Sequence, residues 1–506
     1  MCWSVVEPRF CAATAKAYEG LFTQGSGYLH VRGSLEEHLS DDPQNLDYIR
    51  RPANVTSEKF PETKTKWGTY VPGIYGLHPL LNWELVNLPW FLGIALWADG
   101  EKLDIEQCRI EDYNRELCLK TAVLKRSFTW LTKSGRVLRV VFERFASAAR
   151  PHLFVQKVSV DCTEPTALTI VAGIDADVRT SGYDHFRSVE LDRAGENGIT
   201  CAVRTDGEDT VTMQTELRPI GMRWSLRKAD RRAELAGGVE IPAGERFVLE
   251  KRTAVTTSRD LDSVGCRDVL EATSALGYDE LCEEHTRIWS ARWDQSDVVI
   301  DGDDESQLAM RCAIYHLLRA HVPGDDRVAI DAKGYAGDAY FGRFFWDTEM
   351  YLLPFYLYTA PERARSLVGF RIRTLPGARQ TAANYGYPGA KYPWEADRDG
   401  RDSCPNWQYA DHEVHVTADV VYAMAHYAAA ADDPDFLNMD AAEVIVETAR
   451  YWMARIDWRS GDGYPSLLGV MGPDEYTPIS NNNSYTNRMV RFALELASRV
   501  GSKVGV

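Results

Sequence analysis

Three loops of this sequence each place a carboxylic acid beside an aromatic residue at the end of a helical stretch. Trp346 and Asp347 stand in GRFFWDTEMYLLP, and Trp394 and Glu395 stand in KYPWEADRDG. The third loop, MGPDEYTPISNNNSYTN, holds Glu475 among tyrosines and asparagines. An indole can cover the C–H face of a sugar, and an ionised carboxylate can accept hydrogen bonds from two neighbouring hydroxyls. The three loops together predict a carbohydrate pocket.

Each loop taken alone has a simpler structural interpretation. Acidic residues in the first turn of a helix commonly interact with its dipole, and tryptophan in a helical protein usually belongs to the core. Because three loops of the same composition occur at three different helices, the carbohydrate-binding interpretation is favoured over the structural one. The HEVH segment spaces two histidines three residues apart, not four as in a zinc protease helix. His415 is therefore expected to be structural, or at most a donor lining the pocket, and no metal site is expected.

The overall composition narrows the classes of partner. The chain has 506 residues, a formal net charge of −17 and scattered acidic residues, which disfavours binding to nucleic acid or to an anionic membrane. No apolar run approaches the roughly 18 residues of a transmembrane helix. The first twenty residues lack the apolar run of a signal peptide, and the ten cysteines form no CxxC pair. These features predict a cytoplasmic protein.

Two patterns divide the chain and predict a multidomain β + α protein. Up to about residue 255, apolar residues alternate with polar ones, as at Leu138, Val140 and Phe142, and turn sequences such as KSG and ENG separate the runs. This pattern predicts an N-terminal antiparallel β-sandwich over residues 1–258.

The second half has a helical period. Residues 259–303 are expected to form a helical linker, with Trp289 and Trp293 on one face of a helix. Residues 304–506 are expected to contain about six helices separated by long loops, and loops of that length in a helical domain are usually functional.

Four ordered segments of the second half, FFWDTEMYLLP, YPWEA, EVHVTADVVYA and GVMGPDEYTPISNNNSYTN, resemble glycoside hydrolase family 65. LFTQGSGYLHVRGSLEE, GTYVPGIYG and ELVNLPWFLGI resemble its N-terminal domain. This is a family of inverting disaccharide phosphorylases acting on maltose, trehalose, kojibiose and nigerose, with a minority of hydrolases. The resemblance implies a β-sandwich, a helical linker and an (α/α)6 barrel.

The resemblance also assigns roles to the three loops. It implies that Glu475, in the GPDEY motif, is the general acid, and that Trp346, Asp347, Trp394 and Glu395 surround the glucosyl ring. The implied reaction is inverting phosphorolysis of an α-glucosidic disaccharide to a sugar 1-phosphate and a free sugar. Inorganic phosphate would be a co-substrate, and no metal or organic cofactor is implied.

Other functions stay open at this point. An inverting α-glucoside hydrolase of the same family and an inactive carbohydrate-binding fragment are the alternatives, and a homodimer is possible. Two positions depart from the family pattern: Arg343 and Thr477 stand where histidines are usual. The second of these lies next to the acid, so it bears on the specificity for the leaving sugar and on the tuning of the acid.

The helical region predicts only part of a barrel. A complete (α/α)6 barrel needs about twice as many helices as the roughly six expected here. The resemblance places the phosphate-binding loop, and the base of the hydrolase members, beyond Val506. We therefore expect residues 304–506 to form the first half of the barrel, the last helix to have an apolar face without a partner, and the chain alone to show little turnover.

The acid is expected to carry a proton near neutrality. Its own loop would bury the Glu475 carboxyl group, and nearby carboxylates would oppose its ionisation. Asp474 is the adjacent candidate for that effect, although its side chain could instead cap the following turn. The asparagines at 481, 482, 483 and 487 are expected to hold the loop in one shape.

Overall fold

The computed structural model describes residues 3–37, 68–78, 82–260, 264–459 and 463–504. The chain forms two compact units. The first comprises Met1–Leu77, Leu85–Ala320 and Gly334–Asp338, and the second comprises His78–Glu84, His321–Lys333 and Ala339–Val506. A short stretch from the N-terminal half therefore belongs to the second, helical unit.

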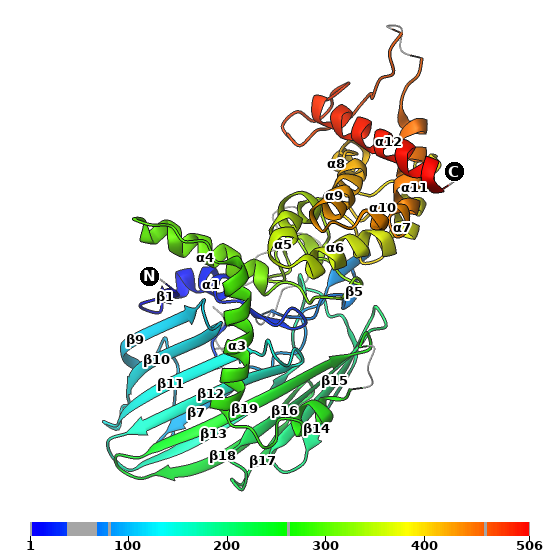
Figure 1. Cartoon of the computed structure of the whole chain (residues 1–506). Helices are drawn as coiled ribbons and strands as arrows, with labels where there is room; N and C mark the ends of the chain where they lie inside the picture. Colours follow the sequence, from blue (N-terminus) through cyan, green and yellow to red (C-terminus); the bar gives the residue numbers. More distant parts are fainter. Residues whose placement is uncertain (1–2, 38–67, 79–81, 261–263, 460–462, 505–506) are drawn as a thin grey trace. The chain divides into compact units, whose positions relative to one another are not determined.

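Two antiparallel sheets form the body of the first unit (Figure 1). The nine-stranded sheet consists, in order, of β1 (Ser4–Glu7), β9 (Arg109–Cys118), β10 (Val123–Leu131), β11 (Val137–Ala146), β12 (Leu153–Cys162), β19 (Arg246–Thr257), β16 (Thr210–Arg218), β15 (Gly198–Thr205) and β14 (Phe186–Ala194). The five-stranded sheet consists of β17 (Ser225–Lys228), β18 (Arg232–Ile241), β13 (Thr166–Asp175), β7 (Ile94–Ala98) and β8 (Glu101–Lys102). A three-stranded sheet contains β2 (Gln24–Gly25), β3 (His30–Val31) and β4 (Thr69–Tyr70). A two-stranded sheet contains β5 (Tyr75–His78) and β6 (Asn82–Leu85).

The alternating residues of the sequence build the core between these sheets. Leu138, Val140 and Phe142 of β11 are buried, and they share one hydrophobic cluster with Ile170 and Ile174 of β13. Because successive side chains of a strand point to opposite faces, each sheet presents one apolar face to the other. The predicted antiparallel β-sandwich is confirmed.

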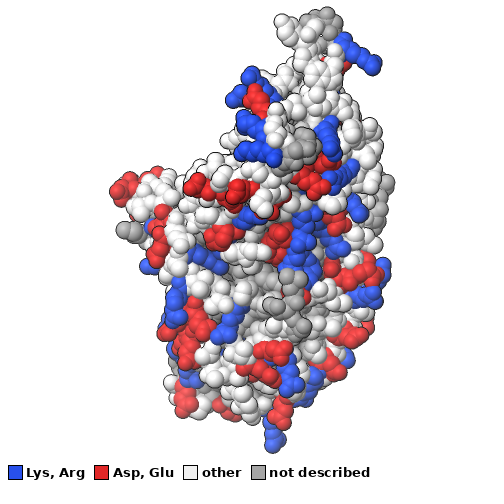
Figure 2. Space-filling model, turned by 45° about the vertical axis from the view of Figure 1, so that its right-hand side comes forward, with Lys and Arg blue, Asp and Glu red and all other residues white. Residues whose placement is uncertain are grey.

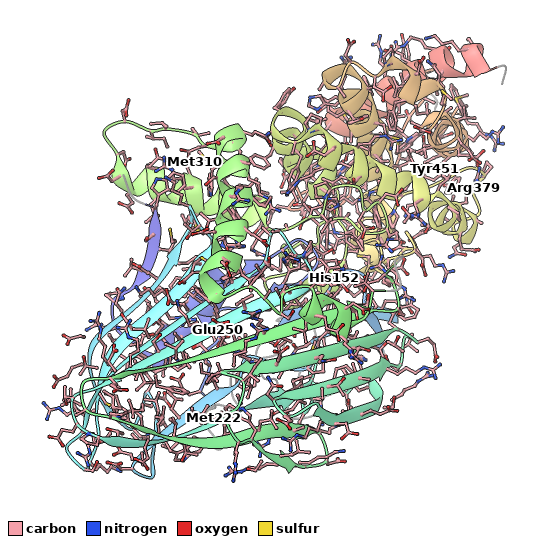
Figure 3. All side chains as sticks on the ribbon, turned by 60° about the horizontal axis from the view of Figure 1, so that its bottom comes forward. His152, Met222, Glu250, Met310, Arg379 and Tyr451 are labelled. Atoms are coloured by element: carbon pink, nitrogen blue, oxygen red, sulfur yellow. The ribbon has the colours of Figure 1, made fainter. Side chains whose placement is uncertain are left out.

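Helices cover part of the large sheet. α1 (Ala12–Leu21), α2 (Cys266–Glu271), α3 (Tyr278–Ser296) and α4 (Asp304–Leu318) all belong to the first unit. Leu270 of α2 and Leu281 of α3 pack against Phe145 and Val155, whose side chains leave the opposite face of the large sheet from the sandwich core. Figure 3 shows Glu250 on β19, where its carboxylate accepts a hydrogen bond from the Tyr278 backbone N–H at 3.1 Å. This bond fixes the start of α3 on the sheet.

The predicted tryptophan pair lies on one face of α3. Trp289 is completely buried and stacks on Tyr315 of α4 with ring centroids 5.1 Å apart. Trp293 is also buried, and its indole N–H donates to the Leu119 carbonyl at 2.9 Å. The two indoles therefore attach α3 both to α4 and to the sheet.

The second unit is helical. It contains a π-helical turn (Thr348–Leu352), α5 (Leu353–Thr359), α6 (Pro361–Arg373), α7 (Leu375–Asn384), α8 (Trp407–His412), α9 (Val416–Ala430), α10 (Pro434–Asn438), α11 (Ala442–Arg455) and α12 (Ser484–Val504). Within the described residues, six helices from residue 304 onward have ten or more residues, namely α4, α6, α7, α9, α11 and α12. The predicted helical domain is confirmed, and the shorter helices were not anticipated.

Helix α9 lies at the centre of the helical unit and packs against α6, α11 and α12. α7 is attached to α11 through Arg379, whose guanidinium donates to Glu443 at 2.6 Å and to Glu447 at 3.1 Å. Figure 3 shows Arg379 and Tyr451 in this unit, on α7 and α11 respectively.

The expectation that the apolar face of the last helix lacks a partner is wrong. Met489, Leu496 and Val500 of α12 are buried, because α9 and α11 of the same chain cover them. Phe492 packs edge-on against Tyr422 of α9 with ring centroids 5.4 Å apart. The periodicity of α12 predicted its apolar face correctly, but the helices that cover this face come earlier in the chain, and the nearer of them, α11, ends at Arg455, 29 positions before α12 begins.

The cysteines, the hydrophobicity of the helices and the surface charge can be compared with what the sequence predicts. Nine cysteines are free thiols in the described part of the chain. Among the described residues, none of the helices combines the length and hydrophobicity that crossing a bilayer requires. On the face shown in Figure 2, basic and acidic side chains lie interspersed, so neither sign of charge covers that face alone.

Candidate active site

A backbone bridge brings the two predicted tryptophan loops together. Phe344 and Ala396 pair in antiparallel fashion, with reciprocal N–H···O bonds of 3.0 and 2.9 Å. Trp346 and Trp394 follow and precede this bridge, and their ring centroids lie 6.3 Å apart. Both indoles are at least nine-tenths buried. The structure therefore assembles one aromatic wall from segments some 50 residues apart in the chain.

A buried ion pair holds the backbone of the loop that carries Trp346 and Asp347. The Arg371 guanidinium donates from Nε and Nη2 to the two Glu349 carboxylate oxygens at 2.7 and 2.8 Å. Nη2 also donates to the Phe345 carbonyl at 3.1 Å. Because neither side chain is more than 3% exposed, this pair fixes the backbone entering Trp346. Asp347 has an exposed side chain, and the protein around its carboxyl group raises its pKa, with Glu349 adding to the effect.

Glu395 lies on the second loop and is buried. Its backbone carbonyl accepts from the Ser403 N–H at 3.0 Å, and the Cys404 thiol lies 3.7 Å from its Oε1. Burial raises the pKa of the Glu395 carboxyl group to about 7, although the nearby Arg343 guanidinium opposes the shift. The group can therefore change its charge near neutral pH.

Arg343, one of the two residues noted above as departing from the motif pattern, holds this region in place. Its side chain is completely buried. The guanidinium donates to the Ser403 carbonyl and, at 2.9 Å, to the Trp83 carbonyl. Trp83 belongs to the short N-terminal segment of the helical unit, and the Arg398 guanidinium lies 4.5 Å from its ring centroid. Arg343 thus joins that segment to the loop after Glu395.

A third group enters from the N-terminal end of α9. His415 Nδ1 lies 2.6 Å from Asp419, whose second oxygen accepts from the Tyr485 hydroxyl at 2.9 Å. The edge of the imidazole meets the Trp346 ring, with centroids 4.7 Å apart. Burial opposes the imidazolium charge, but Asp419 and Glu413 outweigh it and raise the pKa of His415 to about 9. His415 is a buried cation held by Asp419, as expected for a structural histidine, and it also lies beside the aromatic wall.

Glu413 is a site residue that the sequence reasoning missed. It is 1% exposed, and its nearest charged partner is His415 Nε2 at 3.6 Å. Burial raises the pKa of its carboxyl group to about 7, and Glu475 and Asp347 contribute through charge repulsion while His415 opposes the shift. The signal was present in HEVH, where the acid stands two residues before the histidine.

Glu475 reaches the same cluster from an exposed loop. Residues 473–479 are all exposed, so the expectation that the loop itself buries the Glu475 carboxyl group is wrong. The carboxyl group instead interacts with the Tyr409 hydroxyl and, after burial, is the main cause of the raised pKa of that tyrosine. The Tyr409 ring stacks on Trp394 with centroids 6.2 Å apart. Glu475 therefore lies at the edge of the aromatic wall, although it faces solvent.

The side chains beside the acid shape its loop. Asp474 accepts from the Tyr476 N–H at 3.1 Å and from the Thr477 hydroxyl at 2.9 Å, so it caps the turn, as the second of the two expectations proposed. Thr477, the other departure from the family pattern, serves as the donor in that cap. A side chain on Gly472 would come within 2.5 Å of Asn483, so the loop needs glycine there.

The predicted role is confirmed for three of the four asparagines; Asn487 lies within α12, and its Oδ1 has no hydrogen-bond partner among the described residues. Asn481 accepts from the Gly469 N–H and Asn482 accepts from the Leu467 N–H, both at 2.9 Å. Asn483 accepts from the Thr486 N–H at 3.1 Å, which satisfies a free donor in the first turn of α12. These bonds tie both ends of the acid loop to the helical unit.

The cluster has the composition of a sugar site. Within the described ranges, no group of three or more His, Cys, Asp or Glu residues has the arrangement of a metal site. A separate cavity of about 180 Å³ lies in the first unit against Trp90, Trp97 and Glu234. The aromatic wall with its converging acids is the candidate active site, because carboxyl groups of this kind can accept hydrogen bonds from hydroxyls and can exchange protons.

Comparison with known proteins assigns both halves of the chain to one family. Residues 5–292 match the N-terminal domain of glycosyl hydrolase family 65, and residues 311–505 match the central catalytic domain of that family. The chain is 32% identical to kojibiose phosphorylase of Halothermothrix orenii, over 98% of this chain and 65% of the relative. It is 30% identical to maltose phosphorylase of Bacillus subtilis, over 97% of this chain and 65% of the relative.

A solved structure assigned to kojibiose phosphorylase from the human microbiome has the same fold. The TM-score is 0.87 at 24% identity, and the match covers 99% of this chain and 67% of that one. The chain thus spans about 65% of the length of the curated relatives it matches.

The buried ion pair predicts a large effect of one arginine. Arg371→Leu leaves the Glu349 charge buried without its partner, so the free energy of unfolding should fall by about 3–5 kcal/mol. Arg373→Leu on the same helix is the matched control, because Arg373 is 54% exposed and pairs with the equally exposed Asp326. Its effect should stay below about 1 kcal/mol. Urea denaturation of both variants checks this, and equal effects would contradict the role given to Arg371.

The pKa of Glu413 predicts a pH effect on stability. The pKa rises from an ordinary 4.5 to about 7 on folding, so between these values the folded state binds more protons than the unfolded state. The stabilising contribution is present below pH 4.5 and is lost as the pH rises through about 7. Glu413→Gln removes this titration. Its Tm relative to the unsubstituted protein should therefore rise between about pH 5 and 8 in thermal denaturation scans, and a difference that stays constant over this range would contradict the buried titration.

Proposed function

Since this chain belongs to glycosyl hydrolase family 65, we propose that the whole protein cleaves an α-glucosidic disaccharide with inorganic phosphate, releasing a sugar 1-phosphate and a free sugar. The observation that carries the proposal is the joint placement of Trp346, Trp394 and Glu395 with Glu475 at their edge. The names of the relatives, kojibiose and maltose phosphorylase, support phosphate as the second substrate. A cytoplasmic location, where both substrates would meet, remains a prediction.

The aromatic wall and the acids would bind the glucosyl unit. The Trp346 and Trp394 rings offer apolar surface to its C–H face. Asp347 and Glu395 would accept hydrogen bonds from its hydroxyls, and bonds to ionised acceptors are the stronger kind. Holding the ring this way fixes the glycosidic oxygen relative to the acid, which is a substantial part of the catalytic effect.

In the proposed reaction, the Glu475 carboxyl group gives its proton to the glycosidic oxygen as the C1–O bond breaks. A phosphate oxygen attacks the anomeric carbon from the opposite face, so the α-linkage becomes a β-sugar 1-phosphate. The leaving sugar departs with the proton, and the Glu475 carboxylate remains. Phosphate is already an anion, so no protein base is needed to activate it.

A bound disaccharide would also change the surroundings of the acid. The Glu475 loop is exposed in the free protein, and a sugar placed between it and the tryptophans would displace water from the carboxyl group. Loss of water favours the neutral form of a carboxyl group. The substrate would then supply the burial that the loop itself does not provide.

Product analysis tests the reaction type. We expect the whole protein, given kojibiose, trehalose, nigerose or maltose, to form β-glucose 1-phosphate only when inorganic phosphate is added. Proton NMR during turnover distinguishes the β-anomer from the α-anomer. Release of two free sugars without phosphate would instead identify a hydrolase, and sugar binding without turnover of any disaccharide would identify a binding protein.

Replacement of the acid tests its role. Glu475→Gln keeps the shape of the side chain but removes its proton, so kcat should fall by about 10²–10⁴. Sugar binding, followed by tryptophan fluorescence, should be retained. Glu495→Gln on α12 is the control, because Glu495 is an exposed residue paired with Arg491. Near-normal turnover of Glu475→Gln would remove the assignment.

A further inference from the structure

Glu413 brings unused hydrogen-bonding capacity to the site. Its carboxyl group is almost completely buried, yet neither oxygen has a hydrogen-bond partner among the described residues. The His415 Nε2 atom at 3.6 Å attracts the carboxylate but lies beyond hydrogen-bonding distance. Buried polar groups in native proteins are nearly always paired, and an exception calls for a partner that completes it.

We propose that Glu413 is a substrate-binding residue whose two carboxylate oxygens accept hydrogen bonds from neighbouring hydroxyls of the glucosyl unit. The proposal rests on the proposed function and adds a residue to the same site. It would make Glu413 the most deeply buried of the acids that hold the sugar.

The position of Glu413 suits this role. It directly precedes the segment that carries His415, whose imidazole contacts the rings of both Trp346 and Trp394, with centroids at 4.7 and 6.2 Å. Glu475 and Asp347 are close enough to act on the Glu413 charge. The carboxyl group therefore lies close to the residue that contacts both tryptophans and to the two acids assigned to the sugar and to the proton.

The charges around Glu413 select the class of ligand. Glu475, Asp347 and Glu413 can each carry a negative charge, and His415 is the cation paired with Glu413. Three carboxyl groups at one point disfavour an anion such as phosphate. Ionised carboxylates accept hydrogen bonds but cannot donate them, so they cannot satisfy one another. A neutral ligand with several adjacent hydroxyl donors fits all of these conditions.

A purely structural role for Glu413 is the competing explanation. In that case the carboxylate would only orient His415, which Asp419 already holds at 2.6 Å. Replacement of Glu413 would then weaken every ligand by a similar factor, because no single sugar hydroxyl would depend on it. A coupling between the side chain and one hydroxyl separates the two explanations.

The test is a set of binding titrations on the whole protein, followed by tryptophan fluorescence. The ligands are D-glucose and its 2-, 3-, 4- and 6-deoxy analogues, and the variants are Glu413→Gln and the control Glu495→Gln. Glu413→Gln should bind glucose about 10- to 100-fold more weakly, as expected for loss of charge-assisted hydrogen bonds. For at least one deoxy sugar, the unsubstituted protein should bind the analogue more weakly than glucose by a similar factor. The Glu413→Gln variant should bind that analogue and glucose with nearly the same affinity.

A second variant and the binding of sugar by the unsubstituted protein separate failure of this proposal from failure of the proposed function. Glu413→Asp keeps the charge but withdraws it by one methylene group, so it should weaken glucose binding and reduce the same coupling even if the Gln variant folds poorly. Unchanged glucose affinity in Glu413→Gln, or an equal loss for glucose and for every deoxy sugar, would overturn the role of Glu413 and leave the proposed reaction intact. Absence of sugar binding by the unsubstituted protein would overturn both proposals.

Discussion

The reciprocal pair of backbone hydrogen bonds between Phe344 and Ala396 is the constraint on which the rest of the site depends. It is a single antiparallel bridge between two loops, so its geometry is set by the elements around it. Phe344 packs on Phe370 of α6, and Arg371, the next residue, holds the Phe345 carbonyl and Glu349. One turn of α6 therefore carries the support for the whole aromatic wall. Buried bonds of this kind keep binding groups in place before a ligand arrives, which lowers the cost of ordering them on binding.

The charges of the site form a second level of organisation. Five acids lie around the tryptophans, namely Asp347, Glu349, Glu395, Glu413 and Glu475. Each of the three buried ones has a cation nearby: Arg371 for Glu349, Arg343 for Glu395, and His415 for Glu413. Glu349 accepts hydrogen bonds from Arg371 at both of its oxygens. The His415 Nε2 atom lies 3.6 Å from Glu413, and the pKa values of the Glu395 and Glu413 carboxyl groups lie near 7 despite the cations beside them. The fold thus separates an acid that supports the backbone from acids that remain available to a ligand.

The sequence predicted those features that depend on local patterns. Alternation at Leu138, Val140 and Phe142 located a sandwich strand, and aromatic–acid pairs located the two loops that the bridge joins. It did not show that Glu413 is buried without a hydrogen bond, because that depends on the fold around α9. It also failed on the exposure of Glu475 and on the partners of α12, since both are set by contacts between segments distant in the chain. Local composition pointed to the loops that meet in the candidate site, whereas accessibility and pairing required the three-dimensional structure.

The Trp83 segment has a consequence for how this protein can be divided. Although it lies among the strands of the N-terminal half, its backbone carbonyl accepts a hydrogen bond from Arg343, and its ring contacts Arg398. A helical region excised by cutting the gene between the two halves would lose these contacts, and the Arg343 guanidinium would lose an acceptor inside the protein. The two halves are therefore not interchangeable modules. A natural recombination event that paired this helical region with a foreign sandwich would have to bring a matching hairpin along with it.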